Sequence, residues 1–377
     1  MPLDSKFELA RPVMQESQKT LRVFMTVLGR KGGMDRVAEL ITERLEARPD
    51  LDVQITRLTT RGDGGIFGGA FIFASALVQF WIAAIRGKVD ILHLHVAAYG
   101  SAYRKLLLAR VARLHKIPYV VHLHGSRFAE FWPALSPRAR RPIDRLFLES
   151  AKILVLGRFW AQFVAEMLPD VKDQIVIFPN ATMPVSEQPL RPAVTQVRIS
   201  CIGELGARKG TPQLIDALGL LAKRGDWKAT IAGNGDVDGS KARARSLGVA
   251  ELVDIPGWVG SAEVEKILRQ TDILVLPSFA ENLPMAILEG FAHGVAVVAT
   301  PVGAIPEVVD HERNGLIVPV GDVSALADSL RRLIENPELR LRLGEAARRD
   351  HAEHYDINIF VARLAAIWRE AAQSSAA

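Results

Sequence analysis

The feature that most constrains the fold is a regular alternation of short apolar runs with longer helical patterns along the 377 residues. Most runs are continuously apolar, as in VDILHLHV, AKILVLG, DILVLP and VAVVAT. Continuous runs are typical of parallel strands that helices cover on both faces, and the segments between them are long enough for the crossover helices that parallel strands need. The sequence therefore predicts doubly wound α/β sheets.

Six strand candidates fall in each half of the chain, which favours two Rossmann-like domains facing a cleft over one large sheet. The Pro-rich polar segment ATMPVSEQPLRPAVTQ predicts the linker between them. The expected division has an N-terminal tail (1–20), a first Rossmann-like domain (21–185), a linker (186–196), a second Rossmann-like domain (197–354) and a C-terminal helix (355–377) that packs back on the first domain. Ligands of such sheets bind beyond the carboxyl ends of the strands.

Composition excludes some classes and leaves several partners open. Cys201 is the one cysteine, which excludes a disulfide framework and a cysteine-based zinc site. Residues 1–190 carry 26 Lys and Arg against 18 Asp and Glu, whereas residues 191–377 carry 21 against 24. A basic first half fits nucleic acid, an anionic membrane surface or a phosphate-bearing substrate, and scattered solvated arginines are the alternative.

The stretch GGIFGGAFIFASALVQFWIAAI, residues 64–85, carries no charge and is long enough to span a membrane. However, it falls where a crossover helix is needed, and a span there would place neighbouring strands of one sheet on opposite sides of the bilayer. We therefore expect a helix that is either buried or lying in a membrane interface. The aromatic and arginine residues of RFAEFWPALSPRARRPIDRLF suit a headgroup interface and an ordinary solvated helix equally well.

Two glycine-containing loops follow predicted strands and are candidates for phosphate binding. GRKGGMDRV leads into a helix whose free N–H groups and glycines allow close approach of a phosphate, although a plain turn is the alternative. In CIGELGARKGT, Arg208 and Lys209 stand at a helix start, where cations are unfavourable unless an anion arrives, so a diphosphate site is favoured. Neither loop has the GxGxxG spacing of a dinucleotide site.

Histidines occur in two HLH patterns, at His93 and His95 and at His122 and His124. This spacing on strands without a neighbouring carboxylate is poor support for a zinc site. His124 precedes a glycine at a strand end, which favours a role in contacting substrate, whereas His93 and His122 fit hydrogen-bonded core residues equally well.

Two acids stand in SFAENLPMAILEG, between two apolar runs. Glu281 lies in a loop after a strand, and Glu289 lies on a mostly apolar helix, where a carboxylate without a partner is unfavourable. The two hydroxyls of a ribose would satisfy Glu289, and a glutamate reaching solvent at the open end of the helix is the alternative.

Taken together, the motifs resemble the donor site of glycosyltransferase family 4. The resemblance is carried by the E-x7-E block ENLPMAILE, by GELGARKGT, by HGS after the fourth strand and by the GG of the first loop, and it covers the chain from about Leu21 to the C-terminal helix. It implies the GT-B fold and retaining, nucleotide-sugar-dependent transfer. Many relatives carry Arg where this chain has Glu204, and Arg208 could supply the missing cation.

The resemblance also implies roles for individual residues. Glu289 would bind the donor ribose, Lys209 the diphosphate, and Glu281 and His124 the donor sugar. The implied catalytic residues are His124, Arg208, Lys209 and Glu281. The implied donor-binding residues are Gly32, Gly33, Gly203, Asn234, Gly257, Trp258, Val259, Asn282, Leu283, Pro284 and Glu289. The acceptor side would include Arg30, Tyr99 and Ser126.

The expected function is transfer of a hexosyl group from GDP-mannose or a UDP-hexose to a lipid-linked saccharide or glycolipid in surface polysaccharide biosynthesis. We expect no cofactor, no metal and no nucleic-acid partner, and a peripheral location on the inner face of the cytoplasmic membrane. A nucleotide-sugar epimerase of the same fold and a non-catalytic nucleotide-sugar binding protein are the alternatives; a nicotinamide dehydrogenase lacks its fingerprint.

Overall fold

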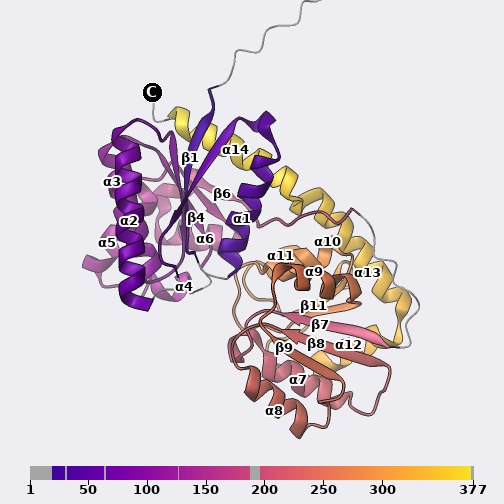
Figure 1. Cartoon of the computed structure of the whole chain (residues 1–377). Coiled ribbons are helices and arrows are strands. Elements are labelled where there is room, and N and C mark those ends of the chain that lie inside the picture. Colours follow the sequence, from indigo (N-terminus) through magenta and orange to yellow (C-terminus); the bar gives the residue numbers. More distant parts are fainter. Residues whose placement is uncertain (1–18, 30–31, 63–64, 126, 187–195, 375–377) are drawn as a thin grey trace, which may run out of the picture.

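The computed structural model describes residues 19–29, 32–62, 65–125, 127–186 and 196–374. Each half of the chain forms a six-stranded sheet, and every pairing of neighbouring strands is parallel. The fold is therefore the predicted pair of Rossmann-like domains (Figure 1). Most of the predicted tail, most of the linker, Arg30 and Ser126 lie outside the described residues.

The first sheet has the strand order β2-β1-β3-β4-β5-β6. Its strands are β1 (Leu21–Val27), β2 (Val53–Thr59), β3 (Ile91–Val96), β4 (Tyr119–Leu123), β5 (Lys152–Val155) and β6 (Ile175–Ile177). Its helices are α1 (Gly33–Glu46), α2 (Gly65–Ile85), α3 (Gly100–Leu114), α4 (Phe128–Phe131), α5 (Pro137–Leu148) and α6 (Arg158–Met167).

The second sheet has the strand order β12-β11-β10-β7-β8-β9. Its strands are β7 (Val197–Ile202), β8 (Trp227–Ala232), β9 (Val253–Gly257), β10 (Ile273–Leu276), β11 (Ala296–Ala299) and β12 (Gly315–Ile317). Its helices are α7 (Thr211–Leu220), α8 (Val237–Ser246), α9 (Ser261–Gln270), α10 (Met285–Ala292), α11 (Ile305–Val308), α12 (Val323–Glu335) and α13 (Pro337–Asp350).

The last helix, α14 (Ile357–Ser374), returns to the first domain. It packs against α1, β3 and β4, and its buried Val361, Leu364 and Trp368 join the core beneath β1. Figure 1 shows it running from the second domain to the first. A helix late in the sequence therefore covers one face of the first sheet, while α2, α3 and α5 lie over the other.

The charge-free helix α2 is not a core helix. Only one side of it is buried, at residues such as Ala76, Phe80 and Ala84, whereas Phe67 is 91% and Phe71 is 78% exposed. The stretch Phe67–Ile85 is long and apolar enough to cross a membrane by length and composition. Of the two expected placements, the buried one does not hold, because α2 meets the domain with one narrow face only, and the placement in a membrane interface stays a prediction.

The two domains are held together by backbone-directed contacts. The Glu307 carboxylate of α11 accepts hydrogen bonds from the backbone N–H groups of Arg158 and Phe159, at 2.7 and 3.2 Å, in the first turn of α6. A negative charge at a helix N-terminus is favourable. Asn180 of the first domain also donates to the carbonyl of Leu283 in the second domain, at 3.0 Å, so the two domains are joined close to the cleft.

Candidate active site

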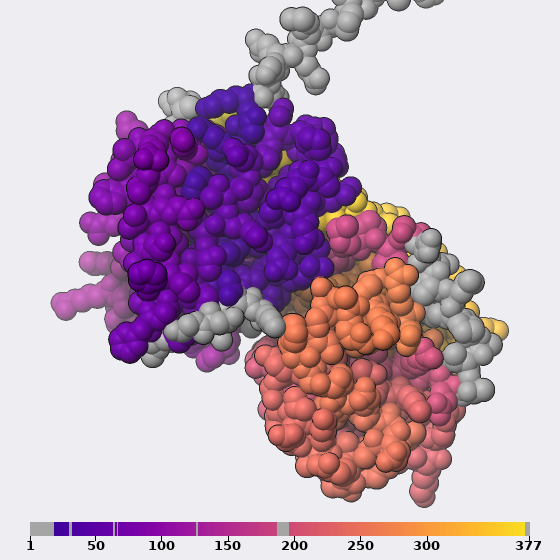
Figure 2. Space-filling model, in the orientation of Figure 1, coloured from indigo at the N-terminus to yellow at the C-terminus, as the bar shows by residue number. Residues whose placement is uncertain are grey.

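A cavity of about 1530 Å³ lies between the two domains, lined by both of them. Figure 2 shows the hollow between the indigo first lobe and the orange second lobe. The volume exceeds the roughly 300–1,000 Å³ of ordinary small-molecule sites, so it can hold a ligand of several linked groups.

The strand orders explain why the cavity is here. The order reverses between β1 and β3 in the first sheet and between β7 and β10 in the second. At such a switch point the following loops part and leave a crevice beyond the strand ends. The glycine loop after β1 and the loops after β7 and β10 therefore face one another across the cleft.

The loop after β7 presents the two predicted cations. Arg208 and Lys209 lie in a 3-10 turn (Ala207–Lys209), which α7 follows. Gly210, which links this turn to α7, has φ +69°, and a Cβ there would lie 2.0 Å from the Pro277 carbonyl oxygen. Only glycine allows this turn to pack against the end of β10, so the loop is held close to the segment after β10 that carries Glu281.

Each cation has an acidic partner. Lys209 Nζ contacts Glu281 Oε1, which also accepts a hydrogen bond from Ser278 Oγ at 3.0 Å. Arg208 pairs with Glu204 at 2.8 Å, at the position where relatives were expected to carry arginine. The positive charge of this loop is therefore partly neutralised by Glu204 and Glu281.

The acidic segment after β10 joins the domains at the floor of the cavity. Asn282 donates to the carbonyl of Leu123 at the end of β4, at 3.4 Å, and its own carbonyl accepts from Ala304 at 2.8 Å. Leu283 and Pro284 also line the cavity before α10 begins. The turn is thereby fixed to the end of the strand that leads to His124.

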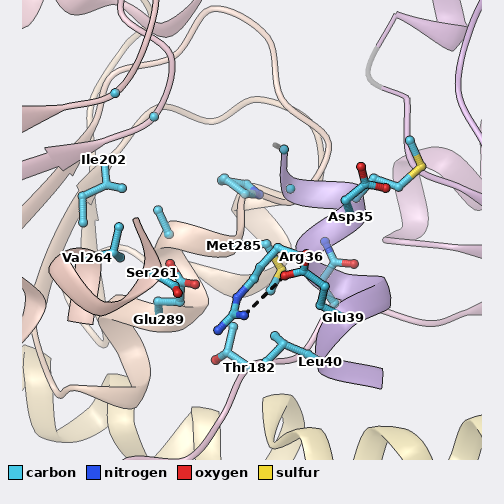
Figure 3. Close-up of a pocket in the computed structure, with 18 of the residues that line it drawn as sticks. Asp35, Arg36, Glu39, Leu40, Thr182, Ile202, Ser261, Val264, Met285 and Glu289 are labelled. Carbon is cyan, nitrogen blue, oxygen red and sulfur yellow. Dashed lines mark ion pairs between the residues drawn. The ribbon is translucent and has the colours of Figure 1, made fainter. Parts of the chain in front are cut away.

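Glu289 lies on α10 and faces a cation of the first domain. Burial raises the pKa of Glu289, while the nearby Arg36 and His293 act to lower it. Figure 3 shows the Arg36 side chain extending from α1 toward Glu289, with an ion pair between Arg36 and Glu39, 3.6 Å apart. A partly buried carboxylate close to a cation suits a ligand that donates hydroxyl hydrogens to it.

His124 lines the cavity from the first domain. Its Nε2 lies 2.8 Å from Nδ1 of His95, a ring that is fully buried. Burial lowers the pKa of His124 to about 3, so the ring is neutral at physiological pH. His124 can therefore accept or donate one hydrogen bond toward the cavity, but it cannot supply a positive charge there.

Most of the predicted site residues line this one cavity. They are Gly32, Gly33, His124, Gly203, Arg208, Lys209, Asn234, Trp258, Val259, Glu281, Asn282, Leu283, Pro284 and Glu289. Gly257 lies one residue outside this lining, where its carbonyl accepts from Gly233 at 2.8 Å. Tyr99 lies outside it too, packed on Phe131 and hydrogen-bonded by Arg127 at 3.2 Å.

The prediction missed Arg36, Glu265 and His293, which line the cavity near Glu289. Arg36 stands in the first turn of α1, where a cation opposes the helix dipole, and that conflict was a usable signal. His293 and Glu265 approach to 3.1 Å, a contact between α9 and the end of α10 that no sequence pattern predicts.

Two family descriptions match consecutive parts of the chain. The glycosyl transferase 4-like domain matches residues 22–181, and glycosyl transferases group 1 matches residues 185–350. An amylovoran biosynthesis glycosyltransferase of Erwinia amylovora is 27% identical over 67% of this chain and 69% of its own. A phosphatidyl-myo-inositol mannosyltransferase of Mycobacterium leprae is 26% identical over 79% of this chain and 77% of its own.

Solved structures agree on the fold. Anabaena Alr3699/HepE, crystallised with UDP, superposes with a TM-score of 0.70 at 16% identity, over 92% of this chain and 98% of that one. Two parallel-sheet domains that face each other across a cleft are the GT-B fold, and the two family matches make the protein a glycosyltransferase with this fold. The two matched domains together cover nearly all of the described residues, and the chain belongs to glycosyltransferase family 4.

Proposed function

We propose that the protein transfers a hexosyl group, with retention of anomeric configuration, from GDP-mannose or a UDP-hexose to a hydroxyl of a lipid-linked saccharide or glycolipid. The observation that carries the donor part is that Lys209, in contact with Glu281, and Glu289 on α10 all line the cavity from the second domain. A cation for the diphosphate, a loop acid for the sugar and a helix acid for the ribose hydroxyls are together what one nucleotide sugar requires.

The chemistry follows from charge. Cleavage of the anomeric C–O bond leaves a nucleoside diphosphate with additional negative charge, which Lys209, Arg208 and backbone N–H groups of the glycine loops would stabilise as it forms. The acceptor hydroxyl attacks from the face that the diphosphate leaves, and a phosphate oxygen of the leaving group takes its proton. Glu281 and Glu289 are not an acid–base couple in this scheme, and no metal is needed.

The names of relatives support the acceptor part. One relative is named for amylovoran biosynthesis and another for phosphatidyl-myo-inositol, a membrane lipid, while Alr3699/HepE was crystallised with UDP-glucose. A lipid-linked acceptor places the enzyme at a membrane, and we propose a peripheral position on the inner face of the cytoplasmic membrane. The exposed apolar face of α2 supports this position, as do the exposed Arg86 and Lys88 that follow it.

The test is transfer of labelled sugar from GDP-mannose and UDP-hexoses to acceptor-bearing membranes, with and without chelator. Wild type should transfer sugar with an unchanged anomeric configuration, and Lys209→Met should not. Conversion of a donor to its epimer without acceptor would identify an epimerase instead. Tight nucleotide-sugar binding without transfer or hydrolysis to any acceptor fraction would identify a binding protein.

A further inference from the structure

Three buried histidines and the partly buried His124 form a row that reaches from the last helix to the cleft. His93 and His95 stand on β3, and His122 and His124 stand on and just after β4, with His95 paired to His122 in the parallel register. Residues two apart on a strand share a face, so all four rings lie on the side of the sheet that α14 covers. Consecutive ring centroids are 4.0–5.3 Å apart.

One end of the row has a fixed hydrogen-bond direction. Trp368 of α14 donates its indole N–H to His93 Nδ1 at 3.0 Å. An indole nitrogen can only donate, so His93 Nδ1 carries no hydrogen and the hydrogen of this neutral ring is on Nε2. That Nε2 lies 3.3 Å from His122 Nδ1 and must donate to it, which leaves the hydrogen of His122 on its own Nε2.

The other end of the row reaches the cavity. His95 Nδ1 and His124 Nε2 are 2.8 Å apart and share one hydrogen, which either ring can carry. The remaining nitrogens of the inner pair, His95 Nε2 and His122 Nε2, are buried without a hydrogen-bond partner among the described residues. Their rings stack with centroids 5.3 Å apart, and one nitrogen from each of His93, His95 and His122 lies within 4.8 Å of the others.

Electrostatics decides whether His95 or His124 carries the hydrogen that the two rings share. The His95 and His122 rings stack at an interplanar angle of 29°. Since His122 carries its hydrogen on Nε2, a hydrogen on His95 Nε2 would bury a second N–H group without a hydrogen-bond partner beside the first, which is costly in a dry core. A bare His95 Nε2 instead leaves the His122 N–H as the single unpaired donor of the stacked pair. The second arrangement puts the His95 hydrogen on Nδ1, from which it is donated to His124 Nε2.

We propose that Trp368 is a positioning residue that, through His93, His122 and His95, holds His124 as the neutral tautomer with its hydrogen on Nδ1. That hydrogen is then the donor available to the cleft, suited to a sugar hydroxyl or a phosphate oxygen. Burial lowers the pKa of every ring in the row, so none is protonated at neutral pH and the direction persists. The role in transfer rests on the proposed function, whereas the tautomer does not.

Three imidazoles this close also fit a metal, and charge argues against one here. The charged neighbour of the row is Lys105, a cation that acts to lower the pKa of His95. A divalent ion would be desolvated beside it without a compensating carboxylate on the row among the described residues, which is costly. Metal content therefore serves as an independent check.

The experiment measures ring tautomers in the free protein by 15N NMR with labelled histidine, and His124→Asn assigns the His124 signals. Wild type should show His124 with its hydrogen on Nδ1. Trp368→Phe keeps the ring and removes the donor, so the His124 signals should shift toward a mixture and kcat should fall several-fold with little change in donor KM. Trp160→Phe is the matched control, because the buried Trp160 indole nitrogen has no hydrogen-bond partner among the described residues.

Should Trp368→Phe fail to fold, His93→Asn gives the same test, since its amide oxygen can accept from Trp368 in place of Nδ1, while its amide group is too short to replace Nε2 as the donor to His122. A His124 hydrogen on Nε2 in wild type, an unchanged tautomer ratio in both variants, or one equivalent of transition metal bound to the row would overturn the inference. If the tautomer shifts as expected while no donor is turned over, the inference stands and the proposed function fails.

Discussion

Lys209 and Glu281 form an ion pair whose side chains are only 18% and 9% exposed. Removing one partner leaves a largely desolvated charge, so Glu281→Gln should lower the free energy of unfolding by about 3 kcal/mol and Lys209→Met by a similar amount. The double variant should lose less than the sum, since neither charge is then unpaired. Urea unfolding of the four proteins measures this coupling, with the exposed Lys223→Met as control.

The same pair predicts a ligand effect. A nucleoside diphosphate supplies the negative charge that Glu281→Gln has removed, so GDP or UDP should raise the melting temperature of this variant more than that of wild type. Lys209→Met should lose that response and about 10²- to 10³-fold in kcat. Equal stabilisation of all variants by the nucleotide would place the diphosphate elsewhere.

Glu289 is expected to cost stability in the unliganded protein. Because burial raises its pKa in the folded state, the folded protein binds protons more tightly than the unfolded chain, and its stability falls as pH rises through the window above the ordinary glutamate pKa. Glu289→Gln should therefore unfold at higher urea concentration at pH 7, with the difference shrinking toward pH 4.5, while donor KM rises about tenfold. Exposed Glu345→Gln should change neither quantity.

Lys105 predicts the opposite pH dependence. It is 1% exposed, with Thr60 and Ser101 hydroxyls at 3.1 and 3.3 Å, and burial lowers its pKa to about 7. Between this value and the ordinary lysine pKa of roughly 10.4, the unfolded chain binds the extra proton, so stability increases with pH. Lys105→Met should be more stable than wild type at pH 7, with a difference that declines toward pH 10, whereas the exposed Lys116→Met should show no such trend.

The apolar face of α2 predicts membrane binding. Phe71 and Trp81 are 78% and 52% exposed, and burying each in a bilayer interface contributes roughly 1.5–3 kcal/mol. Phe71→Ser with Trp81→Ser should reduce co-sedimentation with anionic vesicles at least about tenfold. Leu220→Ser with Leu341→Ser, at exposed positions on the second domain, is the matched control. Wild type that stays in the supernatant at low salt would contradict the membrane position.

The sequence predicted the sheets well because a fully covered strand is apolar at every position, and all twelve expected strands occur. The loop that carries Arg208 and Lys209 and the loop that carries Glu281 could also be predicted, since each follows such a strand. The approach of Arg36 to Glu289 and the contact of Glu307 with α6 were not, because they depend on how two domains meet. The exposure of α2 could not be predicted either, since an uncharged apolar sequence is compatible with a helix in a core and with a helix on an apolar surface.

The return of α14 to the first domain has a consequence for how the protein is made. Val361, Leu364 and Trp368 complete the core beneath β1, β3 and β4, yet they are translated only after all strands of the second sheet. During synthesis the part of this face that α14 covers, including the histidine row, stays uncovered while the second domain emerges, although α1 already packs on the same face. The core of the first domain is therefore completed last, and the histidine row is covered only after the second domain has been synthesised.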